Sequence, residues 1–231
     1  RYSDWPASVK KLPVVGGGLD PSVESVVALK PDVVLLSDAS KAAERLQALG
    51  LKVVALDVKS KADIHRVLGT LGQLLGVPQA QGADRVWHAL ESGIDAVVRD
   101  LPERTRHTRV YFEVSRGPYA AGPQSFIGET LTQLGVDNVV PAELGPFPRL
   151  SPEFLLRAQP DVIMLGNRSM QAATSYPGWH NLQAVKAGRV CVFTDEESYA
   201  IVRPGPRMAQ AAALMARCLA DKAPGKAAVA R

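Results

Sequence analysis

The sequence contains no apolar run of the roughly 18–20 residues that a helix needs to cross a bilayer, which excludes a transmembrane protein. It also contains little cysteine. Cys191 and Cys218 are the only two in the chain, too few for a disulfide scaffold or a four-cysteine zinc site. Two alternatives stay open for them at this point, one disulfide in an oxidising compartment or two buried thiols.

Motifs of several enzyme and metal-site classes are also missing. The glycines at 16–18 are not followed by the Lys-Ser/Thr of a phosphate-binding loop, and no Gly-x-Ser-x-Gly motif occurs. The four histidines never have the i, i+3 or i, i+4 spacing of a helical metal site. The acidic run at 195–197 is interpreted as an exposed turn or a ligand-contacting loop. We therefore predict no enzyme, no catalytic residues, no metal site and no cofactor.

The composition is that of a packed α/β protein. The chain has 231 residues, enough for one large domain or two small ones, and 46% of them are hydrophobic. Its 27 Lys and Arg against 23 Asp and Glu give a net charge of +4. Because basic and acidic residues are interleaved, the sequence predicts no nucleic-acid partner.

Short apolar runs alternate with segments of helical spacing. The predicted strands are 32–36, 51–56, 109–114, 161–165 and 189–193. The predicted helices are 42–49, 61–76, 79–101, 126–134, 151–158, 179–186 and 205–220. This order favours parallel sheets covered by helices, with the strand at 32–36 buried on both faces.

The helix predicted at 79–101 is unusually long for a crossover between strands. At 1.5 Å per residue it would extend roughly 30–35 Å, a length that suits a strut between two lobes. We therefore predict an N-terminal α/β lobe at 1–78, a linking helix at 79–101 and a C-terminal α/β lobe at 102–231.

Two segments of the chain resemble each other. Residues 22–36 are SVESVVALKPDVVLL and residues 151–165 are SPEFLLRAQPDVIML, with six identities at a constant offset of 129. Ser22 and Ser151 are predicted helix N-caps, and Glu24 and Glu153 lie in the first turns, where the helix dipole favours a carboxylate. One structural unit used twice, once per lobe, explains the match. The alternative is that α/β proteins commonly reuse a cap, helix, Pro-Asp and strand.

Several motifs in order give the chain a family resemblance. They are residues 2–6 (YSDWP), 26–32 (VVALKPD), 118–122 (PYAAG), 146–148 (PFP) and 203–207 (RPGPR). The chain resembles the periplasmic substrate-binding proteins of ABC importers that have a helical backbone, in particular the vitamin B12-binding family. The resemblance implies two Rossmann-like lobes with parallel sheets joined by one long helix, and a ligand between the lobes. It also implies a periplasmic monomer with an ABC permease in the inner membrane as partner. The family usually begins with a further strand and helix, which we expect to be missing here.

The resemblance and the predicted loops together suggest the ligand-binding residues. They are Tyr2, Trp5, Arg116, Tyr119, Phe147, Glu196, Glu197, Tyr199 and Arg203. By the resemblance, Tyr2, Tyr119 and Phe147 align with aromatic positions that contact the corrin ring. Two further aromatic positions of the family are here Gly18 and Ser37, which allows another ligand of similar size.

The ligand is accordingly predicted to be cobalamin or a related metal chelate, with haem or a ferric siderophore as alternatives. Haem and many siderophores are anionic, so they would favour arginines. Some of the aromatic residues have structural alternatives: Trp5 could anchor a loop, and Phe126 and Phe147 could belong to the core. A less favoured alternative for the whole chain is a two-lobed chelatase-like enzyme.

The resemblance also implies a role for the two matching glutamates. The family docks on its permease through one glutamate on each lobe, and by alignment these are Glu24 and Glu153. Two separated anions that meet arginines of the permease would orient the encounter and accelerate it. The alternative is that both carboxylates only stabilise their helix N-termini.

Overall fold

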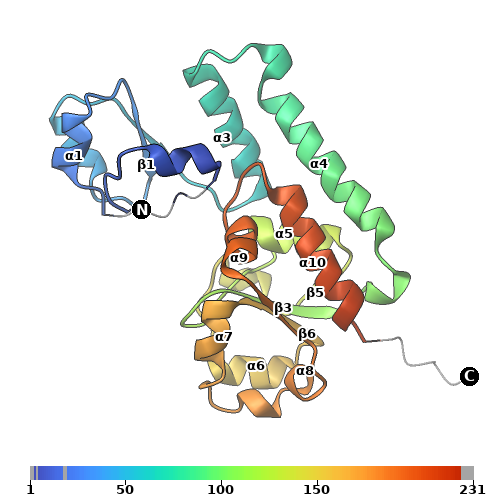
Figure 1. Cartoon of the computed structure of the whole chain (residues 1–231). Helices are drawn as coiled ribbons and strands as arrows, with labels where there is room; N and C mark the ends of the chain where they lie inside the picture. The colour runs from blue at the N-terminus through green and yellow to red at the C-terminus, as the bar shows by residue number, and fades with distance from the viewer. Residues whose placement is uncertain (1–2, 4, 18–19, 225–231) are drawn as a thin grey trace, which may run out of the picture. The chain divides into compact units, whose positions relative to one another are not determined.

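The structure is a computed structural model that describes residues 3, 5–17 and 20–224 (Figure 1). The chain divides into two compact units, Arg1–Asp57 and Val58–Arg231, which are described separately. The sequence placed the end of a first lobe at residue 78, whereas the first compact unit ends at Asp57 and the following helix belongs to the second unit. The division into two lobes and a linking helix stays a prediction.

The first unit contains a short parallel sheet. Its elements are η1 (Ala7–Lys11), α1 (Val23–Ala28), β1 (Val34–Ser37), α2 (Ala43–Ala48) and β2 (Val53–Leu56). β1 pairs with β2 in parallel, with Val34 opposite Val53. Val34 and Leu36 pack on the core under the two helices, while Leu35 is 44% exposed. The prediction that this strand is buried on both faces is therefore wrong, because α1 and α2 supply a core for the face of Val34 and Leu36 and leave Leu35 outside it.

The second unit contains a larger sheet. Its strands are β3 (Arg109–Ser115), β4 (Tyr119–Ala120), β5 (Asp137–Asn138), β6 (Val162–Gly166) and β7 (Val190–Phe193). The order is β4-β3-β6-β7, with β5 also paired to β3, and all these pairings are parallel except that of β3 with β4. Residues 162–165 of β6 are fully buried, as a continuous apolar run predicts for a central strand.

Helices cover this sheet. They are α3 (Lys61–Leu74), α4 (Ala83–Asp100), α5 (Phe126–Gln133), α6 (Pro152–Ala158), α7 (Asn167–Ala173), α8 (Gln183–Lys186), α9 (Asp195–Val202) and α10 (Met208–Lys222). Single 3₁₀ turns lie at η2 (Gln79–Gln81), η3 (Glu103–Thr105), η4 (Ala142–Leu144) and η5 (Trp179–Asn181). The long helix is present as α4, which packs against α3 and α10 (Figure 1). The helix predicted at 179–186 is in fact η5 followed by α8.

Two helices were not predicted, α7 and α9. The acidic residues interpreted as an exposed turn or a ligand-contacting loop form the first turn of α9, so the segment is helical. Contact of this segment with a ligand stays a prediction. Thr194 caps this helix and exchanges hydrogen bonds with Glu197 in a capping box, which satisfies two otherwise unpaired backbone N–H groups. A Thr three residues before a Glu is the sequence signal for this start.

The central strands separate two cores because side chains alternate along them. Val110 and Phe112 of β3 face a core formed mainly with α4, α5 and α10. Tyr111 of β3 faces the opposite core, together with Ile163 and Leu165 of β6. β3 and β6 are thus covered on both faces, as parallel strands require.

The repeated segment is built the same way in both units. Ser22 and Ser151 each accept a hydrogen bond from the backbone N–H three residues later, which caps α1 and α6. Lys30 and Gln159 both adopt the left-handed conformation, at φ 48° and 42°. The left-handed residue was not foreseen, and it follows the same offset of 129 as the sequence match. β1 and β6 lie in different sheets, so each sheet has its own copy of the unit.

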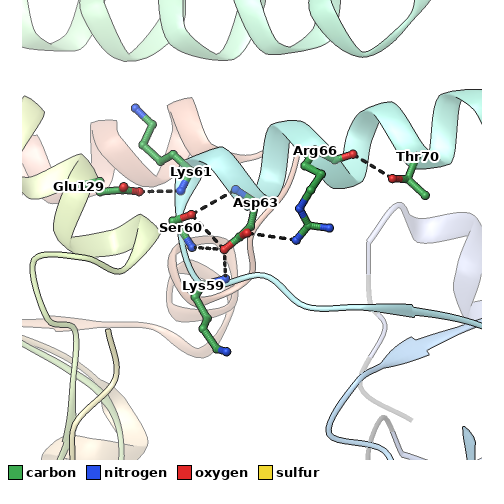
Figure 2. Close-up of polar contacts among 7 residues, drawn as sticks. All are labelled: Lys59, Ser60, Lys61, Asp63, Arg66, Thr70 and Glu129. Atoms are coloured by element: carbon green, nitrogen blue, oxygen red, sulfur yellow. Dashed lines mark hydrogen bonds and ion pairs between the residues drawn. The ribbon is translucent and has the colours of Figure 1, made fainter. Parts of the chain in front are cut away.

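A dense polar cluster starts α3 (Figure 2). The backbone N–H groups of Lys59 and Ser60 both donate to the Oδ2 atom of Asp63, at 3.1 and 3.0 Å. Arg66 adds an ion pair at 3.1 Å. These hydrogen bonds and this charge hold the pKa of Asp63 well below its usual range, because each of them favours the carboxylate.

The same helix start is joined to α5 and α4. The backbone N–H of Lys61 donates to Glu129 Oε2 at 2.6 Å (Figure 2), and its ammonium lies 2.7 Å from Glu91 Oε1 and 2.6 Å from Gln133 Oε1. Lys61 therefore ties the beginning of α3 to both neighbouring helices within the second unit.

The two cysteines form a disulfide, which decides between the two alternatives of the sequence. Cys191 lies in β7 and Cys218 in α10, with their Cα atoms 6.0 Å apart. The bond fastens the last long helix to the edge strand of the larger sheet.

We predict that Asp63→Asn lowers the free energy of unfolding at pH 7 by about 1 kcal/mol, the typical contribution of a helix cap. The pKa of Asp63 is lower in the folded protein than its value of about 3.9 in the unfolded chain, so this stabilisation is present above pH 4 and is lost as the pH falls. The difference between wild type and variant in urea unfolding should therefore shrink from about pH 5 to pH 3. Asp100→Asn, an exposed aspartate in the last turn of α4, is the control. A difference that grew on acidification would contradict the assignment.

We also predict that the double variant Cys191→Ser/Cys218→Ser loses stability. The bond closes a loop of 27 residues, and removing such a closure should lower the free energy of unfolding by about 3–4 kcal/mol. Urea unfolding of the variant, compared with wild type before and after reduction, measures the loss. Reduced wild type should match the variant, and a loss under about 1 kcal/mol would show that the bridge contributes little.

Candidate functional site

A cavity opens where β3 and β6 end. In the sheet, β4 and β5 pair with β3 on one side, and β6 followed by β7 lies on the other side of β3. The direction in which successive strands are placed in the sheet therefore reverses at β3. Ligands of open α/β sheets bind at such a reversal, outside the carboxyl ends of the strands. The cavity there has a volume of about 150 Å³. Its lining residues are Phe112, Glu113, Val114, Ser115, Arg116, Gly166, Arg168, Ser169, Asp195, Ser198, Tyr199 and Val202.

Cationic side chains gather around one aromatic ring at this cavity. The guanidinium of Arg168, from the start of α7, donates two hydrogen bonds to Asp195 Oδ2 at 3.1 and 3.0 Å. The ring of Tyr199 lies 6.0 Å from the guanidinium carbon of Arg168 and 4.1 Å from that of Arg203. Arg116 is exposed on the turn after β3. Such a set can hold an anionic group and stack on a flat ring.

A buried carboxyl group also reaches the cavity. Glu113 is only 1% exposed, and the hydroxyls of Tyr176 and Tyr111 donate to its two oxygens at 3.1 and 3.4 Å. Burial raises the pKa of Glu113 to about 7, against the hydrogen bonds from Tyr176, Ser169 and Tyr111, which favour the ionised form. Burial likewise raises the pKa of Tyr111 and of Tyr176.

Comparison with known proteins agrees with this architecture. The sequence pattern of the periplasmic binding protein family matches residues 2–197. The chain belongs to this family. The fold class predicted from the sequence, an α/β binding protein with a long helix, is thereby confirmed.

Two curated relatives show to which kinds of protein this binding protein is similar. An uncharacterized ABC transporter substrate-binding lipoprotein, YvrC of Bacillus subtilis, is 26% identical over 88% of this chain and 66% of its own length. The vitamin B12-binding protein of Pectobacterium atrosepticum is 27% identical over 95% of this chain and 79% of its own. The chain thus spans about two thirds of the first relative and more of the second.

Solved structures share the fold. A periplasmic haem-binding protein from Pseudomonas aeruginosa has a TM-score of 0.78 at 21% identity, over 96% of this chain and 84% of that one. The periplasmic vitamin B12-binding protein of Vibrio cholerae has a TM-score of 0.72 at 21% identity, over 94% and 85%. In the described part of this binding protein, no helix is long and apolar enough to span a membrane.

The structure brings three of the predicted ligand residues together. Arg116 and Tyr199 line the cavity, and Arg203 stacks on Tyr199. Tyr119 lies in β4, is 42% exposed and is not among the lining residues. Phe147 is half-buried against the core, with its ring 6.0 Å from that of Phe126.

The two predicted glutamates of α9 lie apart from the cavity lining. Glu197 forms an ion pair with Arg217 of α10 at 2.6 Å, and hydrogen bonds at the helix start lower its pKa. Glu196 is exposed in the same turn. Their role in ligand binding stays a prediction, and the contacts of Glu197 hold α9 against α10.

The remaining predicted residues belong to the first unit. Tyr2, like Gly18, lies outside the described residues. Trp5 is 49% exposed. A ligand role for Tyr2 and Trp5 stays a prediction.

The cavity residues that sequence reasoning missed include Glu113, Arg168 and Ser169. Glu113 is the one charged residue within the apolar run 110–114, and a carboxylate in a buried strand is itself a signal. Arg168 and Ser169 follow the strand predicted at 161–165 almost directly. Residues after parallel strands gather at one sheet edge, so position alone could have identified them.

The two matching glutamates are both exposed in the first turn of a helix. The side chain of Glu24 is 82% exposed and lies 3.9 Å from Arg45. Glu153 is exposed at the start of α6, and hydrogen bonds from its own backbone N–H and from Ser151 lower its pKa, so it carries its charge at neutral pH.

Proposed function

We propose that this protein is the solute-binding component of an ABC importer, that it works in the periplasm as a monomer, and that the cavity at the ends of β3 and β6 belongs to its ligand site. The observation that carries the proposal is the set of arginines around Tyr199 at the reversal of strand order. The family and the names of its relatives support it. The disulfide supports an oxidising compartment.

The first ligand candidate is cobalamin or another corrinoid. Curated relatives at 27% identity are vitamin B12-binding proteins, and the exposed ring of Tyr119 offers apolar surface to a large flat ligand.

The second candidate is an anionic metal chelate, haem or a ferric siderophore. It is favoured by Arg116, Arg168 and Arg203, because guanidinium groups pair with carboxylates through two hydrogen bonds. In either case the protein binds the ligand and releases it to the permease, and no bond in the ligand is made or broken. Conversion of the chelate by the purified protein would instead favour the chelatase-like alternative.

Docking on the permease is assigned to Glu24 and Glu153. Each is an exposed carboxylate in the first turn of a repeated helix, one in each compact unit. Two such anions would pair with arginines of the permease and orient the complex.

We predict that haem or cyanocobalamin added to the purified protein changes absorbance and quenches tryptophan fluorescence saturably, with one ligand per chain. Arg116→Ala and Arg168→Ala should each weaken haem binding about tenfold or more, since a hydrogen bond to a charged group contributes about 1.5–3 kcal/mol. Arg99→Ala, an exposed arginine on α4, should leave the affinity unchanged. A flat response to haem, cyanocobalamin and ferric siderophores alike would contradict the ligand class.

We predict that the double variant Glu24→Ala/Glu153→Ala binds ligand like wild type but supports transport about tenfold less well or worse in vesicles that contain the permease. Glu44→Ala/Glu143→Ala removes two other exposed glutamates, one per unit, and is the matched control. Unfolding in urea checks that the loss of two helix-start carboxylates has not changed the fold, because solvent-exposed carboxylates in a first turn contribute little to stability. Equal transport by both double variants would show that the docking assignment is wrong.

A further inference from the structure

Glu113 stands out among the cavity residues as a buried acid whose partners, in the part of the chain that the structure describes, are hydroxyl groups. Its partners are the hydroxyls of Tyr111, Tyr176 and Ser169. Hydroxyls can donate to a carboxylate and can also accept from a protonated carboxyl group, so the pocket around Glu113 accommodates both of its forms.

The charged residues that line the cavity together with Glu113 come from three elements. The turn after β3 carries Arg116, α7 carries Arg168, and α9 carries Asp195. Asp195 pairs with Arg168 at 3.0 Å and offsets much of its charge. The ring of Tyr199 completes this side of the cavity. Arg203, which stacks on Tyr199, adds a further positive charge beside the cavity. An ionised Glu113 would therefore lower, without cancelling, the positive charge available to an anionic ligand.

A hydrogen bond connects Glu113 to the cationic turn. The Tyr176 hydroxyl donates to Glu113 Oε1 at 3.1 Å and accepts from the backbone N–H of Gly117 at 3.4 Å. Gly117 directly follows Arg116, so the hydroxyl of Tyr176 links the carboxyl group of Glu113 to the residue next to that arginine.

We propose that Glu113 is a proton-linked specificity residue, which takes up a proton from solvent when an anionic ligand group enters the cavity. Glu113 itself lines this cavity, so a ligand carboxylate inside it and the ionised Glu113 would repel each other. With the proton on a carboxyl oxygen, Glu113 is neutral and no longer repels the anionic group that the arginines bind. This inference rests on the proposed function, and it adds to that function a reason why the site would distinguish ligands by their charge.

The direction of the pH dependence follows from the burial of Glu113. Burial raises its pKa to about 7, so both forms are populated near neutral pH. Affinity for an anionic ligand is fully present below this pKa and decreases as the pH rises through it. Affinity for a ligand without net charge, such as cyanocobalamin, should change little over the same range.

The test compares haem binding by wild type and Glu113→Gln, which imitates the protonated form. Between pH 6 and pH 8.5, wild type should lose about tenfold more affinity than the variant. Titration of haem itself is the same for both proteins, so the ratio isolates Glu113. Calorimetry at pH 7 in buffers of different ionisation enthalpy should show proton uptake by wild type beyond that of the variant. Glu143→Gln, the same change at an exposed position on η4, should behave like wild type.

Tyr176→Phe provides a second test if Glu113→Gln folds poorly. Removing this donor destabilises the ionised carboxylate, so the midpoint of the pH dependence should move to higher pH. Equal pH dependence in wild type and Glu113→Gln, or an unmoved midpoint in Tyr176→Phe, overturns the inference. If wild type binds neither haem nor cyanocobalamin at any pH, the proposed function itself has failed.

Discussion

The parallel pairing of β3 with β6 is the contact on which the described site depends. Its register sets Val110 opposite Val162 and Glu113 opposite Leu165, so the two strands end at the same edge. The residues directly after each strand therefore lie at that edge, although the two strands are far apart in the sequence. The turn of Arg116 and the start of α7 meet the first turn of α9 there, and the cavity forms between them.

The same pairing explains why a charge lies so deep in the protein. Alternation along β3 sends Val110 and Phe112 to one core and Tyr111 and Glu113 to the other. Glu113 is the last buried residue of that strand and lies at the transition from core to cavity. Three hydroxyls satisfy its oxygens, which offsets part of the desolvation of the carboxylate. Placement at the end of a central strand makes Glu113 both buried and adjacent to ligand space.

The repeated unit has the same local structure in both copies, although its strand is packed differently in each. In both copies a serine caps a short helix, a glutamate lies in its first turn, and a left-handed residue precedes Pro-Asp and a strand. In the second unit the strand is fully buried between two cores, whereas in the first its middle residue Leu35 is largely exposed. The unit is therefore specified by capping and backbone conformation, and the burial of its strand is decided by what packs around it.

Local patterns in the sequence determined most of the elements. Helical spacing predicted α3, α4, α5 and α10, apolar runs predicted β1, β2, β3, β6 and β7, and the offset of 129 predicted the repeated unit. These signals are local because hydrogen bonds and capping within a helix involve residues only a few positions apart. Tertiary structure alone decided that Cys191 and Cys218 pair, that Phe147 packs on Phe126, and that Glu113, Arg168 and Tyr199 share one cavity. Those outcomes depend on strand order and on which helices cover the sheet, and neither is encoded by the spacing of residues within a single segment.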